Sequence, residues 1–258
     1  MGDEPSTHAT TTDYTPLKSY EIALLEEVHQ KFINGKIACK PTHAIYSEMQ
    51  ALIGSKNRSS KYVYNIAEKC ADQSKYWTLL AYFNDEGFGT PKNRHCAFQY
   101  YKKAAELGDP IGQEGAGFSK FEAFRDDKEA HDWTLNAAKA GMGLAAYKLY
   151  SDYGFGHKAE KNELLSIYWL KRSAEIGHLE ARLDLGERYK LGIQVPKDLR
   201  KSFYWYKRSL EVNPKKAIIL AFCYIRGKGT AVDYHETLKY FRYAKKHGLP
   251  VNLKEHVS

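Results

Sequence analysis

The sequence has no apolar run long enough to cross a membrane. Its longest, Ala217 to Ile225, has nine residues, whereas a membrane-spanning helix needs about 20. The first residues also lack the basic start and the apolar stretch of a secretory signal peptide. These absences predict a cytoplasmic protein without a transmembrane segment. Delivery as a secreted effector by a signal-independent route stays open as an alternative.

Cysteine is scarce and widely spaced. The four cysteines, Cys39, Cys70, Cys96 and Cys223, form no CxxC pair, and both disulfide frameworks and zinc sites need closer or paired spacing. The ten histidines form no HExxH motif. We therefore expect free thiols on apolar helix faces and no metal site.

Motifs of catalysis are missing as well. The chain contains no GxxxxGK[ST] phosphate loop and no recognisable serine or cysteine nucleophile motif. The sequence thus predicts a protein that is not an enzyme and that needs no cofactor. A site assembled across distant segments is the alternative that a sequence cannot display.

What is present is a folded, basic chain. Hydrophobic residues make up 43% and aromatic residues 14% of the 258 positions, and 20 residues are tyrosine, which predicts a substantial core. The net charge of +8 favours acidic partners or anionic surfaces. Residues 1–16, rich in Thr, Asp and Pro, predict a disordered tail. Met1-Gly2 with Ser6 fits an N-myristoylation pattern, against which the acidic Asp3 argues.

A repeated phrase is the strongest signal. The aromatic in "YYKKAAELGD" returns with the same surroundings at intervals of 33, 36, 36 and 35 residues. Its positions are Tyr100, Trp133, Trp169, Trp205 and Tyr240. Regular self-similarity at this period is typical of stacked helical repeats. We interpret the aromatic column as core packing.

Start and stop signals bracket a helix around each of these aromatics. Seven residues before each one stands an Asn or Asp that can cap a helix N-terminus: Asn93, Asp126, Asn162, Asp198 and Asp233. Eight residues after each one stands a residue that tolerates the left-handed backbone of a helix end: Gly108, Gly141, Gly177, Asn213 and Gly248. Each repeat therefore contains a helix of about 14 residues.

A second helix fills the rest of the period. It precedes the first and ends at a glycine column made of Gly87, Gly156, Gly192 and Gly227. Lys120 replaces this glycine in the second repeat, so we expect a different loop there. No strand-like alternation appears. The sequence predicts an all-α, right-handed α/α superhelical solenoid of about five 33–36-residue helix-turn-helix repeats.

The repeats do not cover the whole chain. We expect a solenoid over residues 75–250 and a C-terminal tail over 251–258. Residues 17–74 contain helical segments at 17–33, 42–53 and 59–70 without the repeat signature. We interpret them as a degenerate N-terminal repeat that caps the solenoid.

These features carry a resemblance to a known family. The phrases "GFGTPKNRHCAFQYYKKAAELGD" and "GIQVPKDLRKSFYWYKRS" closely resemble the Sel-one-like repeat, a relative of the tetratricopeptide repeat. The paired-cysteine staple of some secreted members is absent here. The resemblance implies a curved α/α superhelix that serves as an adaptor and has no enzymatic activity.

Two surfaces are candidates for binding. In such solenoids the first helix of each pair usually lines the concave surface, where Tyr and Arg are frequent interface anchors. The candidates there are Tyr82, Asn84, Tyr150, Arg182, Arg188, Tyr189, Tyr224 and Arg226. The second surface is a basic ladder on the other helices, made of Lys102, Lys103, Lys171, Arg172, Lys207, Arg208 and Arg242.

The leading functional hypothesis is an adaptor that binds a protein or peptide of unknown identity in the concave groove. The alternative is a binder of acidic lipid or nucleic acid along the basic ladder. Salt dependence separates the two, because polyanion binding releases counterions and weakens steeply as salt rises.

Overall fold

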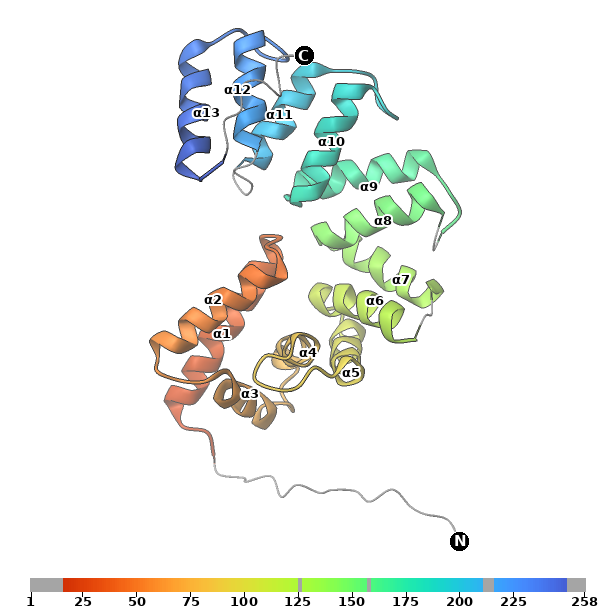
Figure 1. The fold of residues 1–258 in the computed structure, drawn as a ribbon. Coiled ribbons are helices and arrows are strands. Elements are labelled where there is room, and N and C mark those ends of the chain that lie inside the picture. The colour runs from red at the N-terminus through yellow and green to blue at the C-terminus, as the bar shows by residue number, and fades with distance from the viewer. Residues whose placement is uncertain (1–15, 125–126, 157–158, 211–215, 250–258) are drawn as a thin grey trace.

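The computed structural model describes residues 16–124, 127–156, 159–210 and 216–249 (Figure 1). Within these ranges the chain folds into α-helices and one short 3₁₀ turn, with no strand. The helices are α1 (Ser19–Ile37), α2 (Thr42–Ser55), α3 (Ser60–Lys69), α4 (Trp77–Glu86), α5 (Arg94–Glu106), α6 (Pro110–Phe124), α7 (Asp127–Lys139), α8 (Gly143–Phe155), α9 (Glu163–Ile176), α10 (Leu179–Leu191), α11 (Leu199–Ser209), α12 (Ala217–Arg226) and α13 (Tyr234–Lys246). The predicted all-α repeat solenoid is confirmed.

The predicted caps define five helix pairs, α4–α5 to α12–α13. The side chains of Asn93, Asn162, Asp198 and Asp233 each accept a hydrogen bond from the backbone N–H three residues ahead, at 2.9–3.0 Å. The four glycines that end α4, α8, α10 and α12 have φ between 65° and 76°. Local capping chemistry therefore sets the helix boundaries. Asp126 and Asn213 lie outside the described residues.

The second repeat departs from this pattern, as Lys120 predicts. Without a glycine at that column, α6 runs on through Lys120 to Phe124 and reaches 15 residues. The corresponding first helices α4, α8, α10 and α12 have 10–13 residues. A missing stop signal thus lengthens the helix.

The apolar core divides into two clusters at α11. Trp205 belongs to a continuous apolar cluster that extends back through the repeats to α1. Its neighbour Tyr206 belongs to a separate cluster with Leu220, Tyr224 and Tyr240 in α12 and α13. The last helix pair therefore has its own small core.

The superhelix curves so that its N-terminal helices meet the middle of the chain. Figure 1 shows the turn between α1 and α2 lying close to α8 and α10, far from it in sequence. We call α1, α2 and this turn the cap hairpin. Its helices pack against the first repeat through Phe32 against Tyr82 and Tyr46 against Phe88, with ring centroids 5.0 Å apart in both pairs.

Close packing of α6 against α5 depends on a glycine. A Cβ atom at Gly115 would lie 2.3 Å from the buried ring of Tyr101. We expect Gly115→Ala to lower the free energy of unfolding by about 1–3 kcal/mol, even though alanine favours helices, because overpacking a core costs this much. Urea unfolding measures the change.

Gly54 in α2 provides the matched control, since a Cβ there meets nothing within 4 Å. Gly54→Ala should be neutral or stabilising by up to about 1 kcal/mol. Equal effects of the two substitutions would contradict the packing role of Gly115.

Candidate interaction surface

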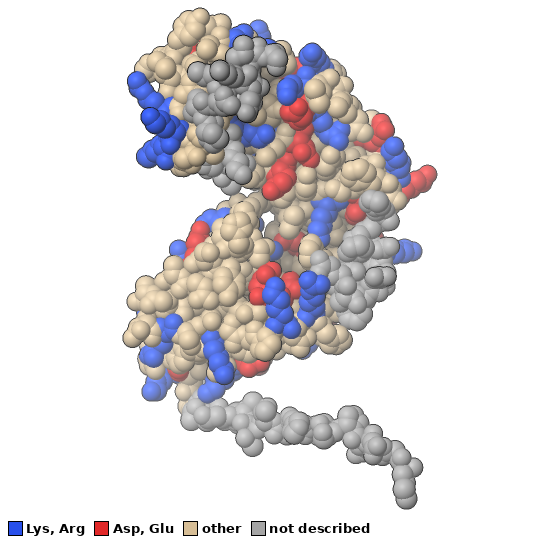
Figure 2. Space-filling view, in the orientation of Figure 1, with Lys and Arg blue, Asp and Glu red and all other residues tan. Residues whose placement is uncertain are grey.

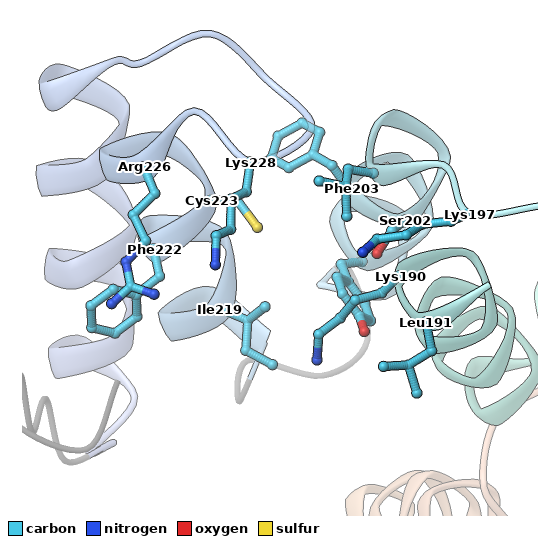
Figure 3. Close-up of a pocket in the computed structure, with 12 residues that line it drawn as sticks. Lys190, Leu191, Lys197, Ser202, Phe203, Ile219, Phe222, Cys223, Arg226 and Lys228 are labelled. Atoms are coloured by element: carbon cyan, nitrogen blue, oxygen red, sulfur yellow. The ribbon is translucent and has the colours of Figure 1, made fainter. Parts of the chain in front are cut away.

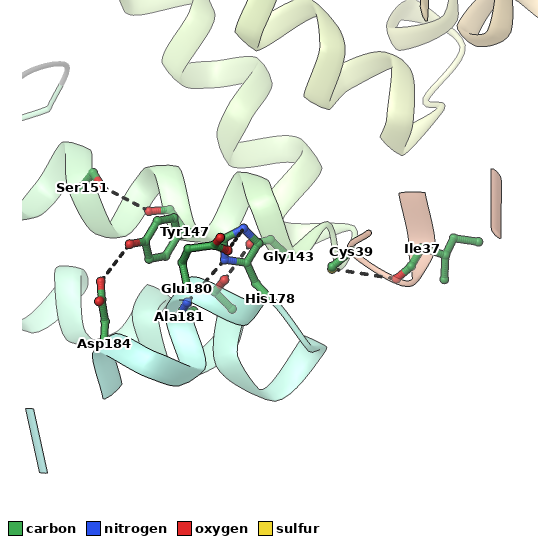
Figure 4. Close-up of polar contacts among 10 residues, drawn as sticks. Ile37, Cys39, Gly143, Tyr147, Ser151, His178, Glu180, Ala181 and Asp184 are labelled. Atoms are coloured by element: carbon green, nitrogen blue, oxygen red, sulfur yellow. Dashed lines mark hydrogen bonds and ion pairs between the residues drawn. The ribbon is translucent and has the colours of Figure 1, made fainter. Parts of the chain in front are cut away.

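The first helices of the repeats present one side to the cap hairpin. The hydroxyl of Tyr82 in α4 donates to the carbonyl of Thr42 at 3.2 Å, and Lys36 Nζ lies 2.8 Å from Glu114 Oε2 in α6. Figure 4 shows Cys39 on the α1–α2 turn beside the start of α8, where Gly143 lies. We call this side of the first helices the inner face. Its N-terminal part is already covered by the cap hairpin.

Cys39 is held at this contact as a packed thiol. A Cβ on Gly143 would lie 2.7 Å from Cys39 Sγ, so glycine leaves the room that the sulfur fills. Burial and the nearby Glu114 carboxylate raise the pKa of the Cys39 thiol. Among the described residues the four cysteines are free. A raised pKa disfavours the thiolate, so Cys39 is not an activated nucleophile.

His178 lies at the same junction and caps α10. Its Nδ1 accepts from the Ala181 N–H at 3.4 Å, and its ring lies 4.7 Å from that of Tyr147 (Figure 4). Burial lowers the pKa of His178, although the carboxylates of Glu180, Glu114 and Asp184 act in the opposite direction. The neutral ring is therefore the form that fits the fold.

This geometry predicts a loss of stability in acid. Because the folded-state pKa of His178 is lowered, the unfolded chain binds the proton first, and stability falls as pH drops below about 6.5. His178→Asn keeps an acceptor at the cap, so the melting temperature of this variant should fall less between neutral pH and pH 5. His29, whose pKa is also lowered by burial, accounts for a remaining dependence. The exposed His235→Asn is the control and should follow the wild type.

Six of the eight predicted groove residues are packed inside the fold rather than displayed. The buried ones are Tyr82, Asn84, Tyr150, Arg182, Tyr189 and Tyr224, each at most 9% exposed. Arg182 illustrates their role, since its guanidinium donates to the carbonyls of Ala174 and Arg208 at the ends of α9 and α11. Residues so enclosed hold helices together, so they offer no accessible anchor for a partner. Arg188 is half-buried and Arg226 is exposed.

The predicted basic ladder lies on the second helices α5, α9, α11 and α13, away from the cap hairpin. Its members are half-buried or exposed. Several already have neighbours: Lys102 lies 3.9 Å from Glu106, Arg172 lies 3.5 Å from Glu175, and Arg208 donates to the Tyr204 hydroxyl at 3.1 Å. Carboxylates therefore interrupt the positive charge.

Sequence reasoning missed a cleft between α10, α11 and α12 (Figure 3). It has a volume of about 600 Å³, within the range of ligand-binding clefts. Its lining consists of Lys190, Leu191, Lys197, Leu199, Ser202, Phe203, Tyr206, Ile219, Phe222, Cys223, Arg226 and Lys228. We call it the C-terminal cleft. No described residue of the cap hairpin lines it.

Comparison with the preceding pair of first helices explains why the cleft is open. Between α8 and α10, the Tyr147 hydroxyl donates to Asp184 and Arg188 donates to the Tyr150 hydroxyl, both at 2.8 Å. Tyr147 and Tyr150 lie nine and six residues before Gly156, the glycine that ends α8. The residues nine and six positions before Gly192, which ends α10, are Leu183 and Gly186. The corresponding Asp and Arg positions become Ile219 and Cys223 in α12. These four residues cannot form the same hydrogen bonds, so the two helices are not tied together in this way.

Comparison with known proteins adds the family. The model of the Sel1 repeat matches residues 78–109, 115–142, 144–178, 179–214 and 217–249, more than half of the chain. The chain belongs to the Sel1 repeat family. Proteins of this family generally act as scaffolds that bind other proteins, and their fold is typically non-enzymatic.

Solved structures agree on the fold of this Sel1 repeat protein. A protective antigen of uropathogenic Escherichia coli with an SLR fold superimposes with a TM-score of 0.64 at 23% identity, over 87% of this chain and 49% of its own. This chain thus spans about half the length of that antigen. A Sel1 repeat protein from Oxalobacter formigenes has a TM-score of 0.58 at 28% identity, over 72% of this chain and 78% of its own. A Pseudomonas aeruginosa protein has a TM-score of 0.51 at 19% identity, over 95% of this chain and 90% of its own.

None of the curated proteins compared with this chain matches it. In the part of the chain that the structure describes, no helix is both long and apolar enough to cross a membrane. The same residues contain no group of three or more His, Cys, Asp or Glu side chains placed to hold a metal ion.

Proposed function

We propose that this Sel1 repeat protein is an interaction scaffold that binds a protein or peptide partner on its inner face. The observation that carries the proposal is the seating of the cap hairpin on that face. A turn of polypeptide already contacts α4, α6 and α8 there through a backbone carbonyl, a lysine and a cysteine. A face that holds one segment of chain in this way has the shape and polarity to hold another.

The part of the inner face beyond the cap hairpin is the part that a partner can reach. Contacts of the hairpin extend to the start of α10, where Leu179 and Glu180 share a cavity of about 310 Å³ with Lys40 and Pro41. The end of α10 and α12 line the C-terminal cleft, and no described residue of the cap hairpin is among the residues that line this cleft. Exposed apolar side chains such as Leu191, 53% exposed, lie there instead.

Capture from a nuclease-treated lysate of the source organism tests the proposal with matched variants. Phe118→Asp alters the inner face beside the cap hairpin, where this 38% exposed side chain of α6 lines a cavity with Lys36 and Thr42. Leu191→Asp alters the inner face beyond the hairpin. The basic ladder is altered by Lys171→Glu with Lys207→Glu. We expect a discrete protein that survives washing at moderate salt, is retained by the ladder variant and is lost from at least one inner-face variant.

Loss of the partner from the ladder variant, with both inner-face variants retaining it, would reject the inner face as the binding site. Material lost at moderate salt, and lost from the ladder variant alone, would favour the acidic lipid or nucleic acid hypothesis. Melting temperatures of all variants, measured in parallel, exclude unfolding as the cause of a lost partner.

A further inference from the structure

We propose that the C-terminal cleft binds an acidic peptide segment of a partner protein, which inserts apolar side chains between α10, α11 and α12. This inference rests on the proposed scaffold function and specifies the chemistry of the partner. Three features support it: the floor of the cleft, the charges around it, and its position between two separate cores.

The floor of the cleft is apolar. Phe203 comes from α11, and Ile219 and Phe222 come from α12, with Leu191 and Leu199 at the edge, 53% and 38% exposed. Large apolar side chains gathered around an open volume of about 600 Å³ are unusual on the surface of a protein that acts alone. Such a groove typically receives the apolar side chains of a partner segment.

The charges around this floor have one sign. Four cationic side chains, Lys190, Lys197, Arg226 and Lys228, line the cleft, and no Asp or Glu is among the described lining residues. Figure 3 shows the nitrogen atoms of Lys190 and Lys197 turned toward the space between the helices. Glu187 neutralises part of this charge, because its carboxylate lies 2.9 Å from Lys190 Nζ and also accepts from the Tyr206 hydroxyl. An acidic segment complements the exposed Lys197 and Lys228.

The cleft also lies where the solenoid is divided. Tyr206 packs with the core of α12 and α13, whereas Trp205 packs with the rest of the chain. At this junction Leu183, Gly186, Ile219 and Cys223 replace the side chains that tie α8 to α10. A segment inserted here would add apolar contacts between α10 and α12 to the packing of Leu183 against the core of α12 and α13. We therefore assign the cleft to a peptide rather than to a polyanion bound by charge alone.

Selection from a short random peptide library, displayed on phage and panned on the full chain at near-physiological salt, tests the proposal without assuming a sequence. We expect the selected peptides to combine Asp or Glu with Leu, Phe or another large apolar residue. Fluorescein-labelled copies of these peptides then give affinities by anisotropy. The double variant Lys197→Glu/Lys228→Glu and the single variant Phe222→Ala should each weaken binding by about tenfold or more.

The matched control is the ladder variant Lys171→Glu/Lys207→Glu, which reverses the same number of charges on the other surface and should bind as the wild type does. Alkylation of Cys223 locates the bound peptide independently, because Cys223 lines the cleft. Bound peptide should slow its alkylation by iodoacetamide, whereas Cys39, Cys70 and Cys96 report any global change. Lys197 and Lys228 are exposed, so their variants should melt as the wild type does.

Other results would overturn the inference. Selected peptides without acidic residues, an unchanged affinity in the Lys197/Lys228 variant, an unprotected Cys223, or no selection at all would each reject the cleft as an acidic-peptide site. Stronger binding of an oligothymidine than of any selected peptide would do the same. If peptides bind and only Phe118→Asp weakens them, the inner-face scaffold stands and the cleft assignment fails. If only the ladder variant weakens them, both fail.

Discussion

Replacing Trp169 with alanine is expected to lower the free energy of unfolding by about 3–5 kcal/mol, the usual cost of removing a large buried aromatic. Trp169 lies in α9, is 7% exposed and belongs to the apolar cluster that runs through the first four repeats. Each repeat of a solenoid is stabilised mainly by its neighbours, so the lost contacts weaken two interfaces together. The total stability of a domain is only about 5–15 kcal/mol.

Thermal melting followed by circular dichroism measures this effect. For a chain of this size, a loss of 3–5 kcal/mol corresponds to a fall of the melting temperature by roughly 10 °C. Leu164→Ala is the control, because Leu164 lies in the same helix but is 86% exposed, and it should change stability by less than about 0.5 kcal/mol. A melt of Trp169→Ala within two degrees of the wild type would show that the aromatic column does not support the core.

The aromatic column shows how far sequence carries the fold. Its period predicted the helix pairs, and the Asn, Asp and Gly columns predicted their ends, because capping depends on residues only a few positions away. The sequence did not show which aromatic side chains of the column are fully buried. Trp169, Trp205 and Tyr240 are buried, whereas Tyr100 and Trp133 are half-buried. The extent of burial depends on the neighbouring repeat, which local sequence does not specify.

The candidate site was harder to predict for the same reason. Tyr and Arg on the first helices looked like interface anchors, yet residues such as Tyr150 and Arg182 complete contacts between repeats. An error of one residue in helix phase moves a side chain by about 100° around the axis, from a displayed to a packed position. The C-terminal cleft left a readable signal, the change of Tyr147 and Tyr150 to Leu183 and Gly186, but only contacts between α8 and α10 give that change its meaning.

No motif in the sequence predicted that the cap hairpin packs on the inner face. The ion pair that holds it there gives the second large prediction. Lys36→Met should lower the free energy of unfolding by about 3 kcal/mol, because it leaves the carboxylate of Glu114, 5% exposed, buried without its cation. The double variant Lys36→Met/Glu114→Leu should recover most of this loss, since an apolar pair removes both buried charges. Urea unfolding of the two single variants and the double variant gives the coupling energy.

This cycle also tests whether the hairpin is held on the inner face by that contact. In Lys36→Met, amide hydrogen exchange should accelerate first at the end of α1 and the start of α2, because local opening follows the weakest contacts. Lys56→Met is the control: its ion pair with Glu27 has both partners nearly half exposed, at 3.3 Å, and such pairs contribute about 0–1 kcal/mol. If both lysine variants behave alike, the pair with Glu114 does not anchor the hairpin. The observation that carries the scaffold proposal would then rest on the contacts of Thr42 and Cys39 and on the ring packing of Phe32 and Tyr46 against the first repeat.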